Sequence, residues 1–253
     1  MRRAVRAGAA PTQTVVRMKT TIKEKREVAK GTLLVLFDLG DAEIDYRPGQ
    51  YFWVELLDPP HQDEKGARRH FTAVTSPSER GVIGFCTRLR ESAFKQSLAD
   101  LPVGTEVEVE PPKGSFVLPE PGHGPLVLVA GGIGITPFRS MLRYIADEGL
   151  PHRVTLIYSN RDRASSAFLD ELEEIEGGGM DLRLVLTMTE DESWPGESRR
   201  VDADFLRDQL GDGLGEARFM VAGPPGFSKA VTAELEEAGV VADRIATDSF
   251  SGY

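Results

Sequence analysis

The sequence predicts two domains: an antiparallel β-barrel, followed by an α/β domain built on a doubly wound parallel sheet. Short strand-like runs separated by turns extend from about residue 14 to residue 118. A segment rich in proline and glycine covers residues 112–125, and strand-like and helix-like segments alternate after it. We therefore expect a flexible tail over residues 1–13, a first domain over 14–120 and a second over 121–253.

Each expected strand of the first domain is a β-rich run close to a turn signal. These strands are 32–37, 51–56, 71–75, 82–87 and 107–110. One short helix is expected near residues 92–101, because Phe94, Leu98 and Leu101 fall on one helical face. Several short strands at this spacing favour a closed barrel over a sandwich.

The second domain begins with an apolar strand that enters a glycine cluster. The expected strands are 126–129, 154–158, 182–186 and 217–221, and the expected helices are 136–147, 166–175, 203–210 and 227–238. After the glycines, Thr136 is expected to be a helix N-cap and Pro137 the first helical residue. The free N–H groups of such a helix start attract anions, so this turn predicts a site for a nicotinamide dinucleotide. A second glycine loop, residues 223–226, is expected at the same edge of the sheet.

Composition excludes several classes of protein. A net charge of −10 over 253 residues argues against a general nucleic-acid binder and against attachment to anionic membranes. No apolar run is long enough to span a bilayer, and residues 1–13 lack the apolar region of a secretory signal. Cys86 is the only cysteine, so we expect no iron–sulfur cluster of the chain's own. The four histidines show no metal-ligand spacing, and the expected localisation is cytoplasmic.

The first domain carries its own ordered motifs. Arg69-His70-Phe71-Thr72 lies on an expected strand, and strand alternation places Arg69 and Phe71 on one face and His70 and Thr72 on the other. The motif is preceded by Pro48-Gly49-Gln50-Tyr51 and followed by Thr75, by the helix start at residues 90–95 and by residues 112–116. Taken singly, each of these is also what an ordinary strand, turn or helix start contains.

In this order, the motifs resemble those of the ferredoxin–NADP reductase superfamily over roughly residues 14–253. Arg69-x-Phe71-Thr72 is similar to the family's flavin motif, Arg-x-Tyr/Phe-Ser/Thr. Residues 131–137 resemble its nucleotide motif, residues 223–226 its second nucleotide loop, and residues 250–253 its aromatic C-terminal ending. The resemblance implies a barrel that binds FAD and an α/β domain that binds NADH or NADPH.

The resemblance also implies roles for individual residues. Thr72 would bond near the flavin N5, Phe71 would pack on the isoalloxazine, and Arg69 would pair with the flavin phosphates. Thr136 would lie near the nicotinamide, and Phe250 or Tyr253 would cover the flavin. The implied catalytic residues are Thr72, Thr136 and Asp248. The implied cofactor contacts are Arg69, His70, Phe71, Thr72, Thr75, Ser92, Ala93, Gly131, Gly132, Gly134, Thr136, Pro137, Gly223, Pro224, Pro225, Phe250 and Tyr253.

Three positions depart from the common family pattern. Ala222 stands where many members have a cysteine, and Asp248 is shorter than the commoner glutamate near the C-terminus. Phe71 lacks the phenol of the commoner tyrosine. We expect one hydrogen bond fewer to the cofactor and no thiol near the nicotinamide.

The implied function is an FAD-dependent NAD(P)H oxidoreductase that passes electrons to a separate one-electron acceptor protein, such as a ferredoxin or an oxygenase. The alternative is an accessory electron-transfer flavoprotein subunit of a larger complex, with weak or regulatory nucleotide binding. Glu190, near the end of the third strand of the second domain, disfavours the 2′-phosphate of NADPH, whereas Arg161 and Arg163 could bind it. The balance favours NADH.

Overall fold

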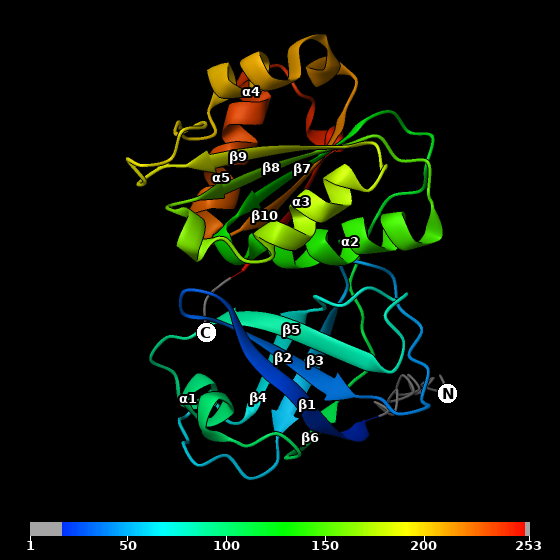
Figure 1. Ribbon diagram of the computed structural model, residues 1–253, viewed down its shortest axis with the longest axis vertical. Coiled ribbons are helices and arrows are strands. Elements are labelled where there is room, and N and C mark those ends of the chain that lie inside the picture. The colour runs from blue at the N-terminus through cyan, green and yellow to red at the C-terminus, as the bar shows by residue number, and fades with distance from the viewer. Residues whose placement is uncertain (1–16, 251–253) are drawn as a thin grey trace, which may run out of the picture.

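The computed structural model describes residues 17–250, which form two stacked domains (Figure 1). The expected tail of residues 1–13 and the terminal Tyr253 lie outside this range. The first domain contains β1 (Met18–Ala29), β2 (Thr32–Asp38), β3 (Tyr51–Leu56), β4 (Arg68–Thr72), β5 (Val82–Arg88), α1 (Ala93–Asp100) and β6 (Glu106–Val109).

The first-domain strands form one antiparallel sheet in the order β4-β3-β6-β1-β2-β5. The Val74 N–H, just after β4, donates to the Gly84 carbonyl of β5 at 2.8 Å. This bond brings the two edge strands together and closes the sheet into a barrel. Phe37, Phe52 and Phe85 fill its centre, with ring centroids about 6 Å apart, as is common for packed aromatic side chains.

The second domain is a parallel five-stranded sheet in the order β11-β10-β7-β8-β9. Its strands are β7 (Leu126–Gly131), β8 (Val154–Asn160), β9 (Leu182–Met188), β10 (Arg218–Gly223) and β11 (Ile245–Ser249). Its α-helices are α2 (Ile135–Glu148), α3 (Leu169–Gly177), α4 (Ala203–Leu210) and α5 (Pro225–Glu237). Short 3₁₀ turns cover Gly132–Gly134, Arg163–Ser165, Gly211–Gly215 and Ala242–Arg244.

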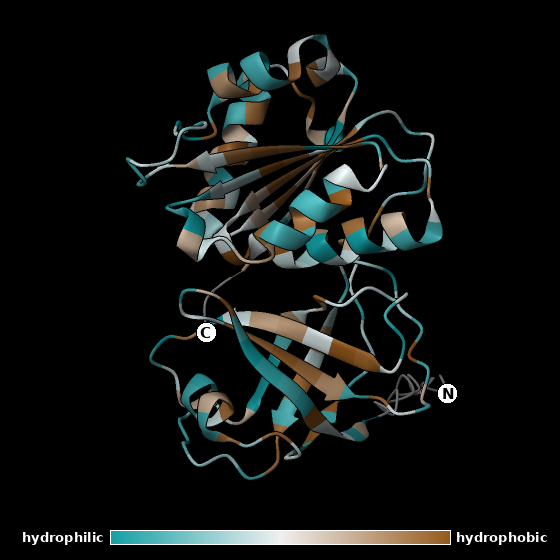
Figure 2. Cartoon of the chain, in the orientation of Figure 1, coloured by the Kyte–Doolittle hydropathy of each residue, from teal (hydrophilic) through white to brown (hydrophobic). Residues whose placement is uncertain are grey.

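Helices cover both faces of this sheet. Along β7, Leu128 packs into the cluster that contains the apolar stripe of α2 and α3, whereas Val127 and Val129 pack into the cluster of α4 and α5. Figure 2 shows the result, apolar strands between helices whose outer surfaces are hydrophilic. Within residues 17–250, no helix is both long and apolar enough to cross a bilayer.

The predicted fold class is confirmed, an antiparallel barrel followed by a doubly wound parallel sheet. Two strands were not predicted. β1 lies in the middle of the barrel sheet, yet half of its side chains are charged and only Thr20 and Ile22 are buried, so it lacks an apolar signal. β11 is a short edge strand with the sequence Ile-Ala-Thr-Asp-Ser.

The start of α2 also differs from the prediction. The helix begins at Ile135, and its N-cap is Gly134 rather than Thr136. The Thr136 hydroxyl lies inside the first turn and donates to the Ile133 carbonyl at 2.7 Å, so it does not accept a backbone N–H as an N-cap would. The reason is the 3₁₀ turn over Gly132–Gly134, which starts the helical winding before Thr136 is reached.

The two domains share part of one apolar core. The α2–α3 cluster of the second domain also contains Leu34, Val74, Cys86 and Leu118 of the barrel. The interface is therefore a continuation of the core, and the barrel packs on the face of the sheet that α2 and α3 cover (Figure 1).

Candidate functional site

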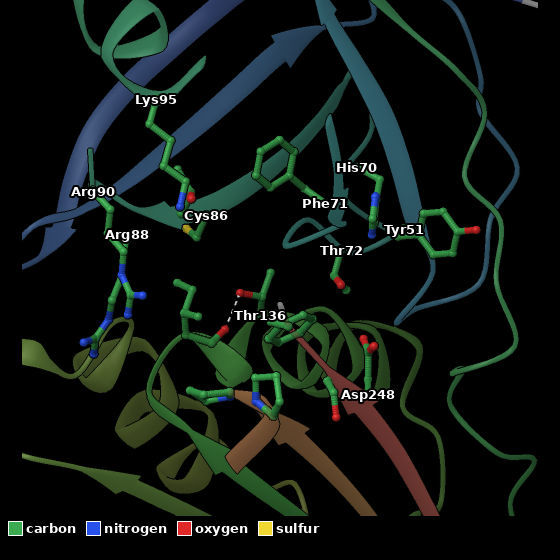
Figure 3. A pocket seen from close by; sticks show the side chains of 16 residues that line it. Tyr51, His70, Phe71, Thr72, Cys86, Arg88, Arg90, Lys95, Thr136 and Asp248 are labelled. Atoms are coloured by element: carbon green, nitrogen blue, oxygen red, sulfur yellow. Dashed lines mark hydrogen bonds between the residues drawn. The ribbon is translucent and has the colours of Figure 1, made fainter. Parts of the chain in front are cut away.

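A cavity of about 360 Å³ lies between the two domains. Its walls come from β3, β4, β5 and α1 of the barrel, from the loop–helix junctions after β7 and β10, and from the end of β11 in the second domain. The lining residues are Tyr51, His70, Phe71, Thr72, Cys86, Thr87, Arg88, Arg90, Lys95, Ile133, Thr136, Pro224, Pro225, Asp248, Ser249 and Phe250. Figure 3 shows Arg88 and Arg90 at one end of this cavity and Tyr51 and Asp248 at the other.

The strand β4 supplies the barrel wall of the cavity. Pairing with β3 places Phe71 beside Phe52 in the barrel interior and His70 beside Trp53 on the opposite face. The Phe71 ring stacks on Phe85, with centroids 3.8 Å apart and planes 7° apart. This part of the wall is therefore flat and aromatic, a surface suited to a planar ring system.

Across the cavity, Thr136 and Asp248 come from the second domain (Figure 3). Burial raises the pKa of Asp248, and a hydrogen bond from the Thr72 hydroxyl opposes that shift. Thr72 and Asp248 thus connect β4 of the barrel with β11 of the parallel sheet. Burial also lowers the pKa of His70, which nearby Lys113 lowers further, so this imidazole is neutral at pH 7.

Positive charge collects at the other end. Within residues 17–250, Arg88, Arg90 and Lys95 form no salt bridge, although all three line the cavity. Burial and the neighbouring Arg90 and Arg69 lower the pKa of Lys95 to about 8. Burial also lowers the pKa of Arg88, as do Arg161 and Arg90. Cations that repel one another in a cavity, without carboxylate partners, are suited to phosphate groups.

Four expected contacts are glycines, and the structure separates them into two kinds. Gly134 packs against the end of β10, where a Cβ would lie 2.0 Å from the Ala222 carbonyl oxygen. Gly131 and Gly223 face the Phe227 ring, with Cβ distances of 2.6 and 2.8 Å. These three are required by packing between the two glycine loops. Only Gly132, with φ +53° and partial exposure, leaves backbone open to a ligand.

The structure does not place Arg69 at the cavity. Its guanidinium is 4% exposed and donates to the carbonyls of Lys65, Gly66 and Arg68 at 2.8–2.9 Å. These bonds, from Nη1 to two carbonyls of the β3–β4 loop and one of β4, hold the guanidinium away from the cavity, while the buried Nε has no partner among the described residues. Arg69 does not line the cavity, whereas Arg88, Arg90 and Lys95 do, and the pairing of Arg69 with flavin phosphates stays a prediction.

Some of the other expected contacts line the cavity and some do not. His70, Phe71, Thr72, Thr136, Pro224, Pro225, Asp248 and Phe250 line the cavity. Thr75 does not, because it is buried in the barrel, where its hydroxyl contacts the Gly84 N–H and the Tyr46 hydroxyl. Pro137 is buried inside α2. Ser92 caps α1 by accepting from the Lys95 N–H at 3.4 Å, and Ala93 begins that helix near the cationic end.

Sequence reasoning missed Arg88, Lys95, Cys86 and Tyr51 as cavity residues. Cys86 and Arg88 lie two apart on β5, so strand alternation pairs them on one face. Lys95 carried no such signal, because a lysine in a short helix is normally exposed. Burial raises the pKa of the Cys86 thiol, which keeps it neutral in the cavity wall.

Two family models match the chain. The oxidoreductase FAD-binding domain matches residues 19–118, and the oxidoreductase NAD-binding domain matches residues 128–233. These matches cover the barrel and most of the α/β domain. They leave the proposed domain boundary, between residues 120 and 121, in the gap between them.

Relatives with named activities cover most of the chain. A flavohemoprotein of Deinococcus radiodurans is 29% identical over 245 residues, 89% of this chain. The reductase component of a propane 2-monooxygenase from Rhodococcus jostii is 28% identical over 216 residues, 83% of this chain. The matched region is 57% of the length of each of these two relatives.

A solved structure shares the fold. A ferredoxin NADP⁺ reductase from Neisseria gonorrhoeae with bound FAD and NADP superimposes with a TM-score of 0.77 at 18% identity. The match covers 94% of this chain and 99% of that one. The two chains therefore share the same two-domain fold.

Proposed function

Because the chain belongs to the ferredoxin–NADP reductase superfamily and is an NAD(P)H-dependent flavin oxidoreductase, we propose that it passes electrons from NADH through FAD to a separate one-electron acceptor protein. The interdomain cavity carries this proposal, since Phe71 and Thr72 of the FAD-binding domain lie opposite Thr136 and Asp248 of the other domain. Bound FAD supplies the chemistry of accepting two electrons as a hydride and releasing them singly.

The protein's part in such a reaction is mainly to position two rings. We assign Phe71 to the flavin plane, and Thr72 to a hydrogen bond at the flavin edge that faces Asp248. Arg88, Arg90 and Lys95 would bind the phosphates of FAD or of the nucleotide at the cationic end. Thr136 and Gly132 would contact the nucleotide at the start of α2.

We propose that the Asp248 carboxylate orients the nicotinamide amide group and accepts a hydrogen bond from the Thr72 hydroxyl. Its carboxyl is largely buried, which raises its pKa and eases protonation. Phe250, whose N–H donates to the Gly223 carbonyl at 2.9 Å, lines the same wall. We propose that the C-terminal aromatic segment covers the flavin until the nicotinamide arrives. Phe250 is its described member, and Tyr253 lies outside the described residues.

A preference for NADH is supported by the loops after β8 and β9. Thr187 is fully buried and donates its hydroxyl to the Arg199 carbonyl, so it is not available to a 2′-phosphate. Arg163 is paired with Asp170 and Glu173. The Glu190 N–H donates to the Arg161 carbonyl at 2.8 Å. This bond holds Glu190, with its carboxylate, next to Arg161. A dianionic phosphate is disfavoured beside that carboxylate.

The names of two relatives support the proposed acceptor class. One of them is the reductase component of a monooxygenase, and another is a flavohemoprotein. The matched region is little more than half of each relative's length. Cys86 is the only cysteine among the 253 residues, so these residues contain no set of thiolates for an iron–sulfur cluster.

Anaerobic titration of the purified yellow protein tests the proposal. NADH should bleach the flavin absorbance stoichiometrically, and kcat/KM with a one-electron dye should be higher for NADH than for NADPH. A protein that retains FAD but is not reduced by either nucleotide would refute the oxidoreductase role. A higher kcat/KM for NADPH would refute the assigned nucleotide alone.

A further inference from the structure

One arginine of the second domain is embedded in the junction between the two domains. Arg139, in the second turn of α2, has a side chain that is only 11% exposed. Its two terminal nitrogens bind both oxygens of Glu79, at 2.7 and 3.1 Å, and Nη1 also donates to the Val74 carbonyl at 2.9 Å. Its Nε donates to Glu171 at 3.0 Å. One guanidinium thus joins three separate segments of the chain.

These partners belong to different domains. Val74 and Glu79 lie in the barrel, on the connection between β4 and β5, whereas Glu171 lies on α3 of the nucleotide domain. The next residue of α2 strengthens the junction, because the Ser140 hydroxyl donates to the Thr75 carbonyl at 2.6 Å. The second turn of α2 is therefore hydrogen-bonded to the residues that immediately follow β4.

The contact is charged and shielded from water. Burial acts to lower the pKa of Arg139, but Glu79 and Glu171 together raise it above its usual value, so the group stays ionised. The fork of an arginine matches a carboxylate with two parallel bonds, which fixes direction as well as distance. Removal of one carboxylate leaves a buried charge only partly compensated.

Each side of this junction continues directly into one wall of the cavity. Phe71 and Thr72 end β4 just before Val74, and Thr136 lies one helical turn before Arg139 and Ser140. Because only a few residues of regular structure separate the junction from each wall, a shift of the junction moves the wall with little bending. The separation between the two walls is therefore set where Arg139 meets Glu79.

We propose that Arg139 is a positioning residue, which holds the FAD-binding wall and the nucleotide-binding wall at the spacing that hydride transfer requires. This inference rests on the proposed function, since it concerns the same cavity. The rate of transfer between two bound rings depends steeply on their alignment, and a misplacement of about 1 Å can cost roughly a hundredfold. Arg139 itself does not line the cavity, so its loss should change the rate more than the affinity for nucleotide.

The two carboxylates allow a matched comparison. Glu79→Gln weakens the interdomain half of the network, and Glu171→Gln weakens the half within the nucleotide domain. Flavin reduction at saturating NADH would be measured by anaerobic rapid mixing, together with the NADH Kd and the nicotinamide–flavin charge-transfer absorbance. We expect Glu79→Gln to reduce the rate about tenfold or more and to weaken the charge-transfer band, with a Kd within about twofold of the original. Glu171→Gln should have a smaller effect.

Arg139→Lys and Arg139→Met complete the series, with Arg207→Met as a control on an exposed pair within α4. Lysine keeps the charge but not the fork, so its rate should lie between those of methionine and arginine. Equal rates in Glu79→Gln and the unsubstituted protein would overturn the proposal. Equal losses in Glu79→Gln and Glu171→Gln would also overturn it, because the effect would then be general destabilisation. If Arg139→Met does not fold, the glutamine pair decides.

Amide hydrogen exchange separates this proposal from the proposed function. Exchange over residues 73–79 should increase in Glu79→Gln and remain unchanged in Arg207→Met, whether or not NADH reduces the flavin. If the unsubstituted protein is not reduced by NADH, the proposed function is refuted. Amide hydrogen exchange then still tests whether Arg139 and Glu79 hold the two domains together. Unchanged exchange over residues 73–79 in Glu79→Gln would then refute the junction as well.

Discussion

Substitution of Gly132 by alanine separates backbone strain from ligand contact. Gly132 has φ +53°, and a Cβ there would lie 3.2 Å from the Arg88 Nη2 atom, the mobile end of a long side chain. Gly149, at the opposite end of α2, has φ +60°, and a Cβ there would meet no atom within 4 Å. The two glycines share a left-handed backbone, but only Gly132 adjoins the cavity.

The expected magnitudes follow from that difference. A left-handed conformation costs an L-residue about 1–2 kcal/mol, so Gly132→Ala and Gly149→Ala should lower the free energy of unfolding by similar amounts. At Gly132, the added methyl also keeps a phosphate from the backbone N–H. Loss of such a charge-assisted hydrogen bond costs about 1.5–3 kcal/mol. At about 1.4 kcal/mol per factor of ten, NADH should bind Gly132→Ala roughly tenfold to a hundredfold more weakly.

Two measurements test this reasoning. Urea unfolding gives the stability loss of each variant, and titration of the flavin spectrum with nucleotide gives the Kd. Gly149→Ala should bind NADH as the unsubstituted protein does. If both variants bind NADH equally well after equal losses of stability, Gly132 does not contact the nucleotide, and its glycine serves only the turn.

Three further predictions concern side chains of the cavity. Thr72→Val keeps the side-chain shape but removes the hydroxyl, so flavin reduction should slow by about tenfold while the free energy of unfolding changes by about 1 kcal/mol or less; an unchanged rate in rapid mixing would contradict this. Burial raises the pKa of Asp248, so the stability that its protonated form provides is present at acid pH and is lost as the pH rises through the folded-state pKa. Asp248→Asn should therefore gain stability relative to the unsubstituted protein as the pH rises from about 4 towards 7, and parallel urea-unfolding profiles across that range would contradict it. The pKa of Lys95 is about 8, so the affinity of the apoprotein for FAD should fall as the pH rises through about 8, whereas Lys95→Met should bind FAD more weakly at pH 7 and lack this fall. Fluorescence titration measures both, and the absence of a pH effect in the unsubstituted protein would contradict the assignment.

The strands β7, β8 and β10 of the parallel sheet were predictable because they are largely buried on both faces. Runs such as 126–129 are continuously apolar, and each is followed by a helix with an apolar stripe. The barrel was harder, since β1 has charged residues along its exposed face although it lies between β6 and β2. Hydrogen bonding to two neighbours, rather than apolar burial, makes it a central strand, and pairing of this kind leaves no local pattern in the sequence.

The candidate site shows the same division. Motif order singled out Thr72 and Thr136, which both line the cavity because each stands at the end or the start of an element whose position the fold sets. The orientation of Arg69 was not predictable, since its carbonyl partners lie in a loop whose path depends on the whole barrel. Lys95 and Arg88 resembled surface cations in the sequence, and only the approach of the second domain encloses them in a cavity.

The same cavity concentrates features that destabilise the ligand-free protein. Among the described residues, Arg88 and Lys95 lie near other cations and form no salt bridge, and burial disfavours the charged form of the Asp248 carboxyl. The apolar core that both domains share offsets these costs, and the Arg139 network orients the domains around them. We propose that a dianionic dinucleotide bound at the cationic end would relieve the repulsion between the cations, so that binding and folding would be coupled there. By mass action, FAD at a hundred times its Kd adds about 2.7 kcal/mol to the free energy of unfolding. Bound phosphates would therefore raise the free energy of unfolding by neutralising these cations.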